Sequence, residues 1–374
     1  MSRGALETPP EENQPPQLGK PSNVAAGVPA IISTMKHGIS KSGITGAFSS
    51  LNRVNKFGGF DCPGCAWPDP DGHRTIAEFC ENGAKAVADE ATKKTITPEF
   101  FGQHSVQELS TKSDQWLNSQ GRLSSPMILK SGSNNYTSIS WNEAFDMIAD
   151  ELCSLKEPDD AIFYTSGRTS NEAAFLWQLL ARGFGTNNLP DCSNMCHESS
   201  GFALSDSIGI GKGTVKLEDF NKADLILVVG QNPGTNHPRM LTALRDARKN
   251  GASIISINPL IETGMKKFKH PQNPLEMLGS GKSIADQHVR VQINGDLALF
   301  RGINNLLLKD EMYDSNFIDD FTSNFDAYKE SISEVEWSVI EEISGVAKSE
   351  IQTLANIISK SKSMITCWAM GITQ

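Results

Sequence analysis

The stretch ADLILVVGQNPGTNHPRMLTALRDARKNGASIISINP, residues 223–259, decides the fold class of this chain. An apolar run ends at Gly230, and a loop rich in Asn, Pro and Gly leads to Pro238, which the first turn of a helix tolerates. That helix is predicted to run to about Lys249, and a second apolar run follows Gly251. Because neither run alternates with polar residues, both are expected to be strands of a parallel sheet that is covered on both faces.

The same alternation of strands and helices continues toward the N-terminus. Residues 161–165 (AIFYT) predict a strand. Ser140 and Glu143 form a capping-box pattern at the start of one predicted helix. Thr169 and Glu172 form a second such pattern, at the start of a helix that Gly183 would end. Strands separated by helices indicate an α/β fold, and in such sheets ligands bind beyond the carboxyl ends of the strands. The loops after the predicted strands are therefore the expected binding edge.

Toward the C-terminus the pattern also persists. Residues 295–308 and 349–362 predict helices, and the apolar runs at 289–294 and 363–372 predict strands. The polar segment 266–288 interrupts this alternation and is predicted to be a long surface insertion.

Composition excludes several classes of protein. The 374 residues carry a net charge of -10, and no cluster of Lys and Arg suggests binding to nucleic acid. We find no apolar run of the roughly 18 to 20 residues needed to span a membrane. No secretory signal is evident, so a cytoplasmic location is expected. Seven cysteines, an odd number, favour metal or redox chemistry over a disulfide framework.

Composition and hydrophobic periodicity along the sequence divide the chain into three parts. Residues 1–58 are rich in Pro, Gly and Ser without a helical or strand period, which predicts a flexible N-terminal arm. Residues 59–137 contain a cysteine-bearing segment, and residues 138–374 contain the α/β region.

The cysteine-bearing segment contains Cys62, Cys65, Asp69 and Cys80. Two thiolates on the CPGC turn can converge on one metal ion or cluster. A carboxylate at Asp69 can also ligate iron, but it is a harder donor than a thiolate and would alter the redox potential. A structural zinc site, or turn cysteines without a ligand, are the alternatives.

Cys196 and His197 stand side by side in DCSNMCHESSGFAL, residues 191–204, just before a predicted helix. A helix N-terminus favours the thiolate form that a nucleophile or a metal ligand must have. The neighbouring imidazole can move a proton near neutral pH. A buried cysteine beside a hydrogen-bonded histidine is the alternative.

From about residue 58 to residue 374, the order of these motifs resembles that of the molybdopterin oxidoreductases, and within them the formate-dehydrogenase-like alpha (catalytic) subunits. The resemblance implies that Cys196 ligates molybdenum, or tungsten, in a Mo-bis(molybdopterin guanine dinucleotide) cofactor. It also implies that His197 takes part in moving substrate hydrogen. Related nitrate reductases have the cysteine without the following histidine, so the pair favours the formate branch.

The resemblance further implies two ligand sets. A [4Fe–4S] cluster would be held by Cys62, Cys65 and Cys80, with Asp69 as the candidate fourth ligand. The residues implied to contact a pterin guanine dinucleotide are Arg168, Asn171, Gly230, Asn232, Pro233, His237 and Asn258.

The implied activity is the two-electron oxidation of formate or a similar small-molecule substrate. Electrons would pass through the cluster to an electron acceptor, either a protein or a small molecule. The alternatives are a non-catalytic iron- or zinc-binding module for interaction or redox sensing, and a nitrate-reductase-like reductase.

The sequence departs from the family at three positions and in length. Asp69 replaces a cluster cysteine, Asn82 stands where the family often has a lysine, and Asn258 replaces an aspartate. Family members run to about twice the length of this chain, which stops at Gln374. The implied fold is therefore an incomplete molybdopterin oxidoreductase fold, domains I–II: a small iron–sulfur segment followed by a parallel-sheet, dinucleotide-binding-like domain. We expect this chain to be inactive by itself.

Overall fold

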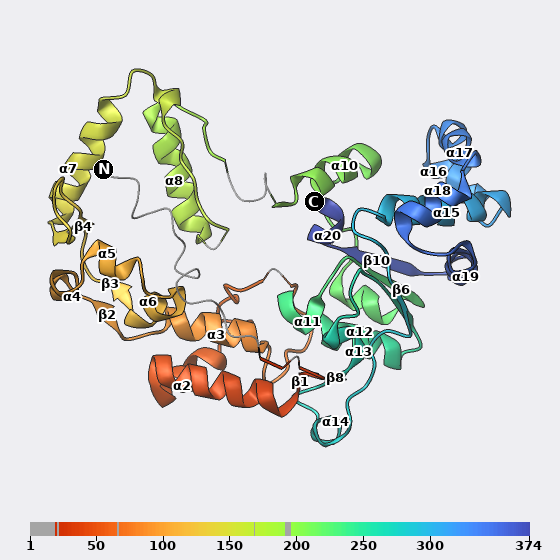
Figure 1. Ribbon diagram of the computed structural model, residues 1–374, viewed down its shortest axis with the longest axis horizontal. Helices are drawn as coiled ribbons and strands as arrows, with labels where there is room; N and C mark the ends of the chain where they lie inside the picture. The colour runs from red at the N-terminus through yellow and green to blue at the C-terminus, as the bar shows by residue number, and fades with distance from the viewer. Residues whose placement is uncertain (1–18, 21, 66, 168, 191–195) are drawn as a thin grey trace. The chain divides into compact units, whose positions relative to one another are not determined.

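The structure is a computed structural model, shown in Figure 1. It describes residues 19–20, 22–65, 67–167, 169–190 and 196–374. The chain forms two compact units. The first unit contains the described residues of 1–21, 32–64 and 77–192, and the second unit contains those of 22–31, 65–76 and 193–374.

A four-stranded parallel sheet forms the centre of the second unit, with strand order β10-β6-β7-β9. The strands are β6 (Leu225–Val229), β7 (Ser253–Ile257), β9 (Gln287–Val289) and β10 (Met364–Trp368). The predicted α/β class and parallel sheet are thus confirmed. β9 begins two residues before the strand predicted at 289–294 and is shorter.

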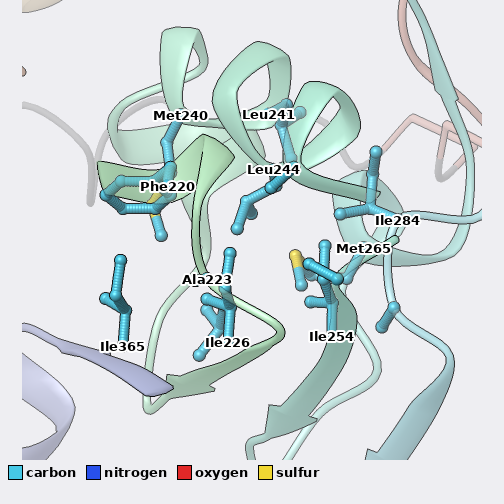
Figure 2. Close-up of a cluster of buried hydrophobic side chains, with 14 of the residues drawn as sticks. Phe220, Ala223, Ile226, Met240, Leu241, Leu244, Ile254, Met265, Ile284 and Ile365 are labelled. Atoms are coloured by element: carbon cyan, nitrogen blue, oxygen red, sulfur yellow. The ribbon is translucent and has the colours of Figure 1, made fainter. Parts of the chain in front are cut away.

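The two faces of this sheet are covered by different helices. Ile226 and Val228 pack in one core cluster with residues of α12 (Arg239–Lys249), and Figure 2 shows this cluster. The other residues of β6 pack on the opposite face in a second cluster. The helices that contribute to the second cluster are α15 (Asp296–Lys309), α18 (Trp337–Ser344) and α19 (Lys348–Ile358).

The prediction of a surface insertion at 266–288 is wrong for much of that segment. It contains β8 (Phe268–Lys269) and α14 (Pro274–Leu278), and Phe268 and Ile284 are buried in the first core cluster. Phe268 stands between two lysines, and only the short apolar pair Ile284 and Ala285 follows Ser283, so no helical or strand period predicts the burial of these side chains.

Two further short elements contact that segment. α13 (Thr263–Lys266) contributes buried Met265, and β8 pairs in parallel with β1 (Ala25–Ala26). The remaining helices of the second unit are α10 (Glu198–Ile208), α11 (Pro233–Asn236), α16 (Ser315–Phe321), α17 (Phe325–Ser333) and α20 (Met370–Thr373), with a short 3₁₀ turn at Leu217–Asn221.

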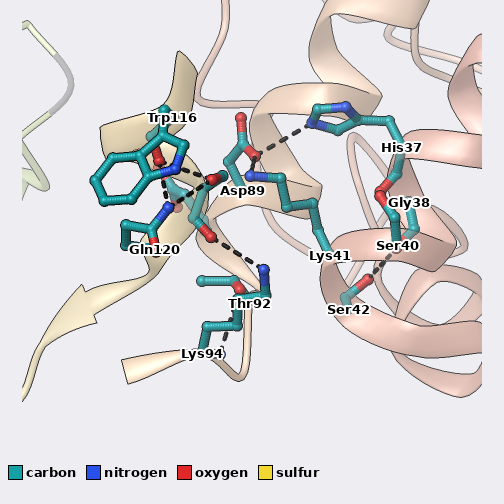
Figure 3. Close-up of polar contacts among 12 residues, drawn as sticks. His37, Gly38, Ser40, Lys41, Ser42, Asp89, Thr92, Lys94, Trp116 and Gln120 are labelled. Atoms are coloured by element: carbon teal, nitrogen blue, oxygen red, sulfur yellow. Dashed lines mark hydrogen bonds and ion pairs between the residues drawn. The ribbon is translucent and has the colours of Figure 1, made fainter. Parts of the chain in front are cut away.

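The expected absence of helix in residues 1–58 is wrong for α2 (Gly27–Leu51). Its many Gly and Ser residues hide the helical period, and Gly43 interrupts the helix with φ 73° and ψ 170°. In the first unit α2 is tied to α3 (Glu81–Glu90): His37 Nε2 and Lys41 Nζ lie 3.2 and 3.3 Å from Asp89 Oδ1 (Figure 3). The three-part division of the chain stays a prediction.

Of two longer helices of the first unit, one begins with the predicted capping box, whereas the capping box predicted at Thr169 and Glu172 for the other is wrong. α7 (Trp141–Cys153) has Ser140 and Glu143 in a reciprocal capping box. α8 (Asn171–Phe184) is capped by Ser170, one residue after the predicted Thr169. It ends at Gly185, in the left-handed conformation with φ 111°, and not at Gly183.

Residues 161–165 do not form a strand of any described sheet, so that prediction is wrong. The segment is extended, and the Phe163 N–H donates to the Asn188 carbonyl at 2.9 Å. Its apolar character reflects a small separate cluster in which Phe163 packs with Ala181 of α8.

The first unit also contains shorter elements. They are α4 (Pro98–Gln103), α5 (Val106–Leu109), α6 (Asp114–Gln120), a 3₁₀ turn at Pro158–Asp160, the parallel pair β2 (Thr95–Ile96) and β3 (Arg122–Leu123), and the antiparallel pair β4 (Met127–Ile128) and β5 (Thr137–Ser138). Across the described ranges, no helix has the length and apolar character required to cross a membrane.

Candidate functional site

The carboxyl edge of the sheet in the second unit brings two backbone segments into close contact. Gly230 ends β6 with φ 61°, and its N–H donates to the Ile257 carbonyl at 2.8 Å. A Cβ atom on Gly230 would lie 3.0 Å from the Cα of Gly371, in α20. Both the positive φ and the close approach require glycine at this position.

The loops after β6 and β7 are joined by a carboxylate. Asn232 Nδ2 donates to Glu262 Oε2 at 2.8 Å, and Asn258 Nδ2 lies 3.4 Å from Glu262 Oε1. Asn232 also caps α11, since its Oδ1 accepts from the Thr235 N–H at 3.2 Å. The structure thus brings two of the predicted dinucleotide-binding residues together through Glu262. Sequence reasoning missed Glu262, although a carboxylate five residues after the end of β7 is a signal to look for.

One buried acceptor at this edge fits a ligand that donates hydrogen bonds, such as the pterin guanine dinucleotide that the resemblance implies. Gln231 is 7% exposed, and its Oε1 is buried without a partner among the described residues. Buried acceptors are normally paired, so this oxygen suits a ligand donor. A Cβ on Gly234 would lie 3.2 Å from the Cα of Gly264, so α11 and α13 approach closely beside buried Pro233.

His237, at the end of the same loop, lies against an aromatic ring. Its imidazole stacks on Trp67 with ring centroids 6.0 Å apart and an interplanar angle of 9°. Burial lowers the pKa of the His237 imidazole below its usual range, so the ring is neutral at neutral pH. Trp67 was not predicted as a site residue.

Cys196 lies two residues before the first residue of α10, and the exposed His197 directly precedes that helix, where the sequence predicts the Cys–His pair. The Cys196 Sγ is 3.4 Å from the Met370 Sδ, in α20. Because Gly371 follows Met370 and contacts Gly230, Cys196 belongs to the same edge as the loop after β6.

The contact between α10 and α20 is fixed by hydroxyl groups. Ser199 Oγ donates to the Thr373 carbonyl at 2.9 Å, and Ser200 shares a 2.7 Å hydrogen bond with Thr373 Oγ1. Trp368 Nε1 also donates to Ser200 Oγ at 3.2 Å. Burial raises the pKa of the nearby Cys367 thiol to about 12, so this cysteine is a protonated core residue at neutral pH.

In the first unit, Cys62 and Cys80 gather beside Gly83. A Cβ on Gly83 would lie 2.7 Å from the Cys62 Sγ and 3.7 Å from the Cys80 Sγ. The Cys80 sulfur caps α3 by accepting from the Gly83 N–H at 3.3 Å. A thiol at a helix N-terminus is a favourable metal ligand because the thiolate is stabilised there.

The other two predicted cluster ligands, Cys65 and Asp69, belong to the second unit. Asp69 Oδ2 lies 2.8 Å from Arg74 Nη1, and Asp69 Oδ1 lies 2.7 Å from Arg239 Nη1. Within the described ranges, no three or more His, Cys, Asp or Glu side chains form a metal-binding group. The four-residue cluster site therefore stays a prediction.

The last two predicted dinucleotide-binding residues, Arg168 and Asn171, are not part of the loops after β6 and β7. Arg168 falls outside the described residues. Asn171 is the exposed first residue of α8, directly after the Ser170 cap.

Comparison with known proteins identifies the family. The family model described as Molybdopterin oxidoreductase matches residues 122–374. An uncharacterized oxidoreductase of Mycobacterium tuberculosis is 52% identical over 356 residues, which are 94% of this chain and 46% of that protein. Protein YdeP of Escherichia coli is 48% identical over 332 residues, 86% of this chain and 44% of that protein.

Two more distant proteins share part of the chain. Formate dehydrogenase H of Escherichia coli is 31% identical over 259 residues, 68% of this chain and 34% of that protein. Acetylene hydratase from Pelobacter acetylenicus shares the fold at 20% identity and a TM-score of 0.54, over 66% of this chain and 32% of that protein. This chain spans less than half the length of the curated relatives it matches. On this evidence the chain belongs to the molybdopterin oxidoreductase family.

Proposed function

We propose that this chain is the cofactor-binding part of an oxidoreductase that oxidises formate, or a similar small substrate, by two electrons. The cofactor in this proposal is molybdenum, or tungsten, held by two molybdopterin guanine dinucleotides. The observation that carries the proposal is the Cys196 thiol at the sheet edge, 3.4 Å from the Met370 Sδ and two residues before α10. A soft thiolate in this position suits a molybdenum–sulfur centre. When bound, this cofactor supplies the two-electron redox chemistry.

His197 is the proposed proton acceptor. Oxidation of formate to carbon dioxide releases two electrons and one proton, so the site needs a base beside the metal ligand. His197 directly follows Cys196 and is exposed, so an imidazole nitrogen is available to take the substrate proton. The similarity to a protein named formate dehydrogenase H supports formate as the first substrate to test.

The residues at the ends of β6 and β7 would bind and orient one dinucleotide. In this proposal Gly230, Pro233 and His237 line the binding loop, and Gln231 Oε1 accepts a hydrogen bond from the ligand. Glu262 holds the amide groups of Asn232 and Asn258 in position. Cofactor contacts by Arg168 and Asn171 stay a prediction from the resemblance.

The electron route is also part of the proposal. Cys62, Cys65 and Cys80 would hold a [4Fe–4S] cluster that passes electrons to a protein or small-molecule acceptor. Cys62 and Cys65 are three residues apart, so chain connectivity keeps their Cα atoms within about 11 Å. The convergence of Cys62 and Cys80 beside Gly83 supports two of the three ligands. A cytoplasmic location, and inactivity of this chain by itself, remain predictions.

The test replaces Cys196 by Ala, in this chain and in a version extended to the length of its relatives, both purified without oxygen. In the long Cys196→Ala protein, we expect loss of molybdenum and of formate-dependent dye reduction, with iron retained. Cys153→Ala is the matched control, because this exposed cysteine lies on α7 and should leave metals and activity unchanged. Formate oxidation that persists in the Cys196→Ala protein would refute the metal-ligand assignment.

A further inference from the structure

Residues 67–74, named here the strap, are attached to the rest of the second unit by contacts that could not be predicted from the sequence. Trp67 stacks on His237 and meets Phe220 edge to face, with ring centroids 5.7 Å apart at 74°. Further along, the Asp71 N–H donates to Glu218 Oε1 at 2.8 Å. Aromatic contacts of this kind stabilise a fold by more than the burial of their apolar area alone.

Asp69 is the central attachment of the strap. Each of its carboxylate oxygens faces a different guanidinium group, 2.8 Å from Arg74 and 2.7 Å from Arg239. The three side chains are only 20%, 16% and 13% exposed, in the order Asp69, Arg74, Arg239. Loss of one partner from ion pairs this far removed from water strongly destabilises the folded structure, because the remaining buried charge is no longer compensated.

This arrangement conflicts with a role for Asp69 as an iron ligand. If one of these carboxylate oxygens bound a metal instead, it would lose its contact with the guanidinium group that it now faces. Charge-assisted pairs between arginine and carboxylate are among the stronger polar contacts in proteins. The geometry therefore favours Asp69 as the anchor of the strap.

The attachments of the strap converge on one loop. Trp67 contacts His237, and Asp69 contacts Arg239, the first residue of α12 and only two residues further along. Cys65 lies two residues before Trp67, so chain connectivity keeps the Cys65 Cα within about 7 Å of the Trp67 Cα, and fixing Trp67 also restricts Cys65.

We infer that Asp69 is a positioning residue: through Arg74 and Arg239 it fixes the strap, and with it Cys65, at the edge of the sheet where the dinucleotide is proposed to bind. It is not a cluster ligand. The consequence for Cys65 rests on the proposed function, whereas the ion-pair clamp itself does not.

The experiment uses tryptic cleavage after Arg74 in the purified chain, followed by mass spectrometry of the fragment ending at residue 74. Paired and largely buried, Arg74 should be cleaved slowly in the wild-type chain. In Asp69→Asn, we expect cleavage to be about tenfold faster or more, because the loss of one buried partner opens the strap. Asp69→Glu keeps the charge and should restore slow cleavage.

Asp71→Asn is the matched control. Asp71 lies in the same strap, but its side chain is 75% exposed and 3.9 Å from Lys216, so its loss should leave cleavage unchanged. Arg239→Gln serves as a second variant if Asp69→Asn does not fold, and it should also accelerate cleavage. Wild-type cleavage in Asp69→Asn, or in Arg239→Gln, would overturn the inference.

Asp69→Cys separates the clamp from a ligand. The clamp predicts fast cleavage and no gain of iron, whereas a ligand position predicts slow cleavage and a thiolate-bound cluster with at least as much iron per chain. The second result would overturn the inference. If the wild-type chain holds no iron, the proposed cluster fails, while the comparison of cleavage rates still tests the clamp.

Discussion

In the second unit all five residues of β6 are buried, whereas the apolar side chains of α7 in the first unit remain largely exposed. Trp141, Phe145 and Ile148 are 62%, 60% and 58% exposed. β6 has a core cluster on each face, and α7 contributes none of the core clusters' fully buried residues. Because hydrophobic stabilisation scales with the apolar area removed from water, the stability of this chain is concentrated in the second unit.

The largest expected difference between the two regions comes from truncating an apolar side chain in each. Ile226→Ala removes a fully buried side chain from β6 and should destabilise the second unit by about 2–5 kcal/mol. Phe145→Ala on α7 should cost less than about 1 kcal/mol, because that ring is already mostly in water. Urea unfolding followed by circular dichroism measures both. Equal losses would mean that α7 is covered in solution.

A second contrast uses glycine and predicts opposite signs. Gly230→Ala places a Cβ at a positive φ and 3.0 Å from Gly371, so we expect a loss of about 2–3 kcal/mol. Gly183→Ala, inside α8, meets no atom within 4 Å and should gain about 0.5–1 kcal/mol from helix propensity. Thermal unfolding of both variants checks the signs. A tolerated Gly230→Ala would show that the sheet edge can relax.

The same contrast explains what the sequence could reveal. β6, β7 and β10 were predictable because each is mainly apolar without a strict alternation of polar residues, and α7 because Ser140 and Glu143 form a capping box. α2 was missed because its Gly and Ser residues dilute the helical period. The prediction of a strand at 161–165 was wrong because Phe163 is buried against Ala181 of α8 and not within a sheet.

For the site, positions within one loop were easier to predict than links between loops. Asn232 and Asn258 stand at strand ends, where α/β sheets bind ligands, and the structure brings them together. Glu262, which joins them, and Arg239, which pairs with Asp69, act across long separations in sequence. The contacts of Glu262 with Asn232 and of Arg239 with Asp69 are set by tertiary packing, and no local spacing encodes them.

Glu262→Ala tests this link between loops. Hydrogen bonds to a partly buried carboxylate should make its loss cost about 1–2 kcal/mol and loosen the loops after β6 and β7. Glu81→Ala, which breaks a surface pair with Lys85 in α3 of the first unit, should cost less than about 0.5 kcal/mol. Thermal unfolding gives the stability, and hydrogen exchange at Thr235 reports the loop. Unchanged exchange would show that Glu262 does not hold Asn232.

The smallest expected effect is a pH dependence at the opposite, amino-terminal edge of the sheet. Asp224, just before β6, accepts from Ser361 Oγ, from the Lys362 N–H at 2.8 Å and from the Ser363 N–H at 3.2 Å. These hydrogen bonds, that from Ser361 first, lower the pKa of the Asp224 carboxyl below its ordinary value of 3.8. A lowered folded-state pKa adds stability above the ordinary value, and that stability is lost as pH falls through the folded value.

Asp224→Asn should therefore remove part of the acid-induced loss of stability below about pH 4 and lower stability at neutral pH. Because the carboxylate is exposed and screened by solvent, the effect should stay below about 1 kcal/mol. Glu143→Gln is the comparison in the first unit, since hydrogen bonds with the Ser140 backbone and side chain also lower the pKa of that carboxyl. Unfolding measured from pH 2.5 to 7 distinguishes the two variants. Asp224→Asn weakens the contact between the segments before β6 and β10, so it should shift the unfolding of the sheet. A shift in sheet unfolding with Glu143→Gln, and none with Asp224→Asn, would mean that α7 contributes to the main cooperative unit after all.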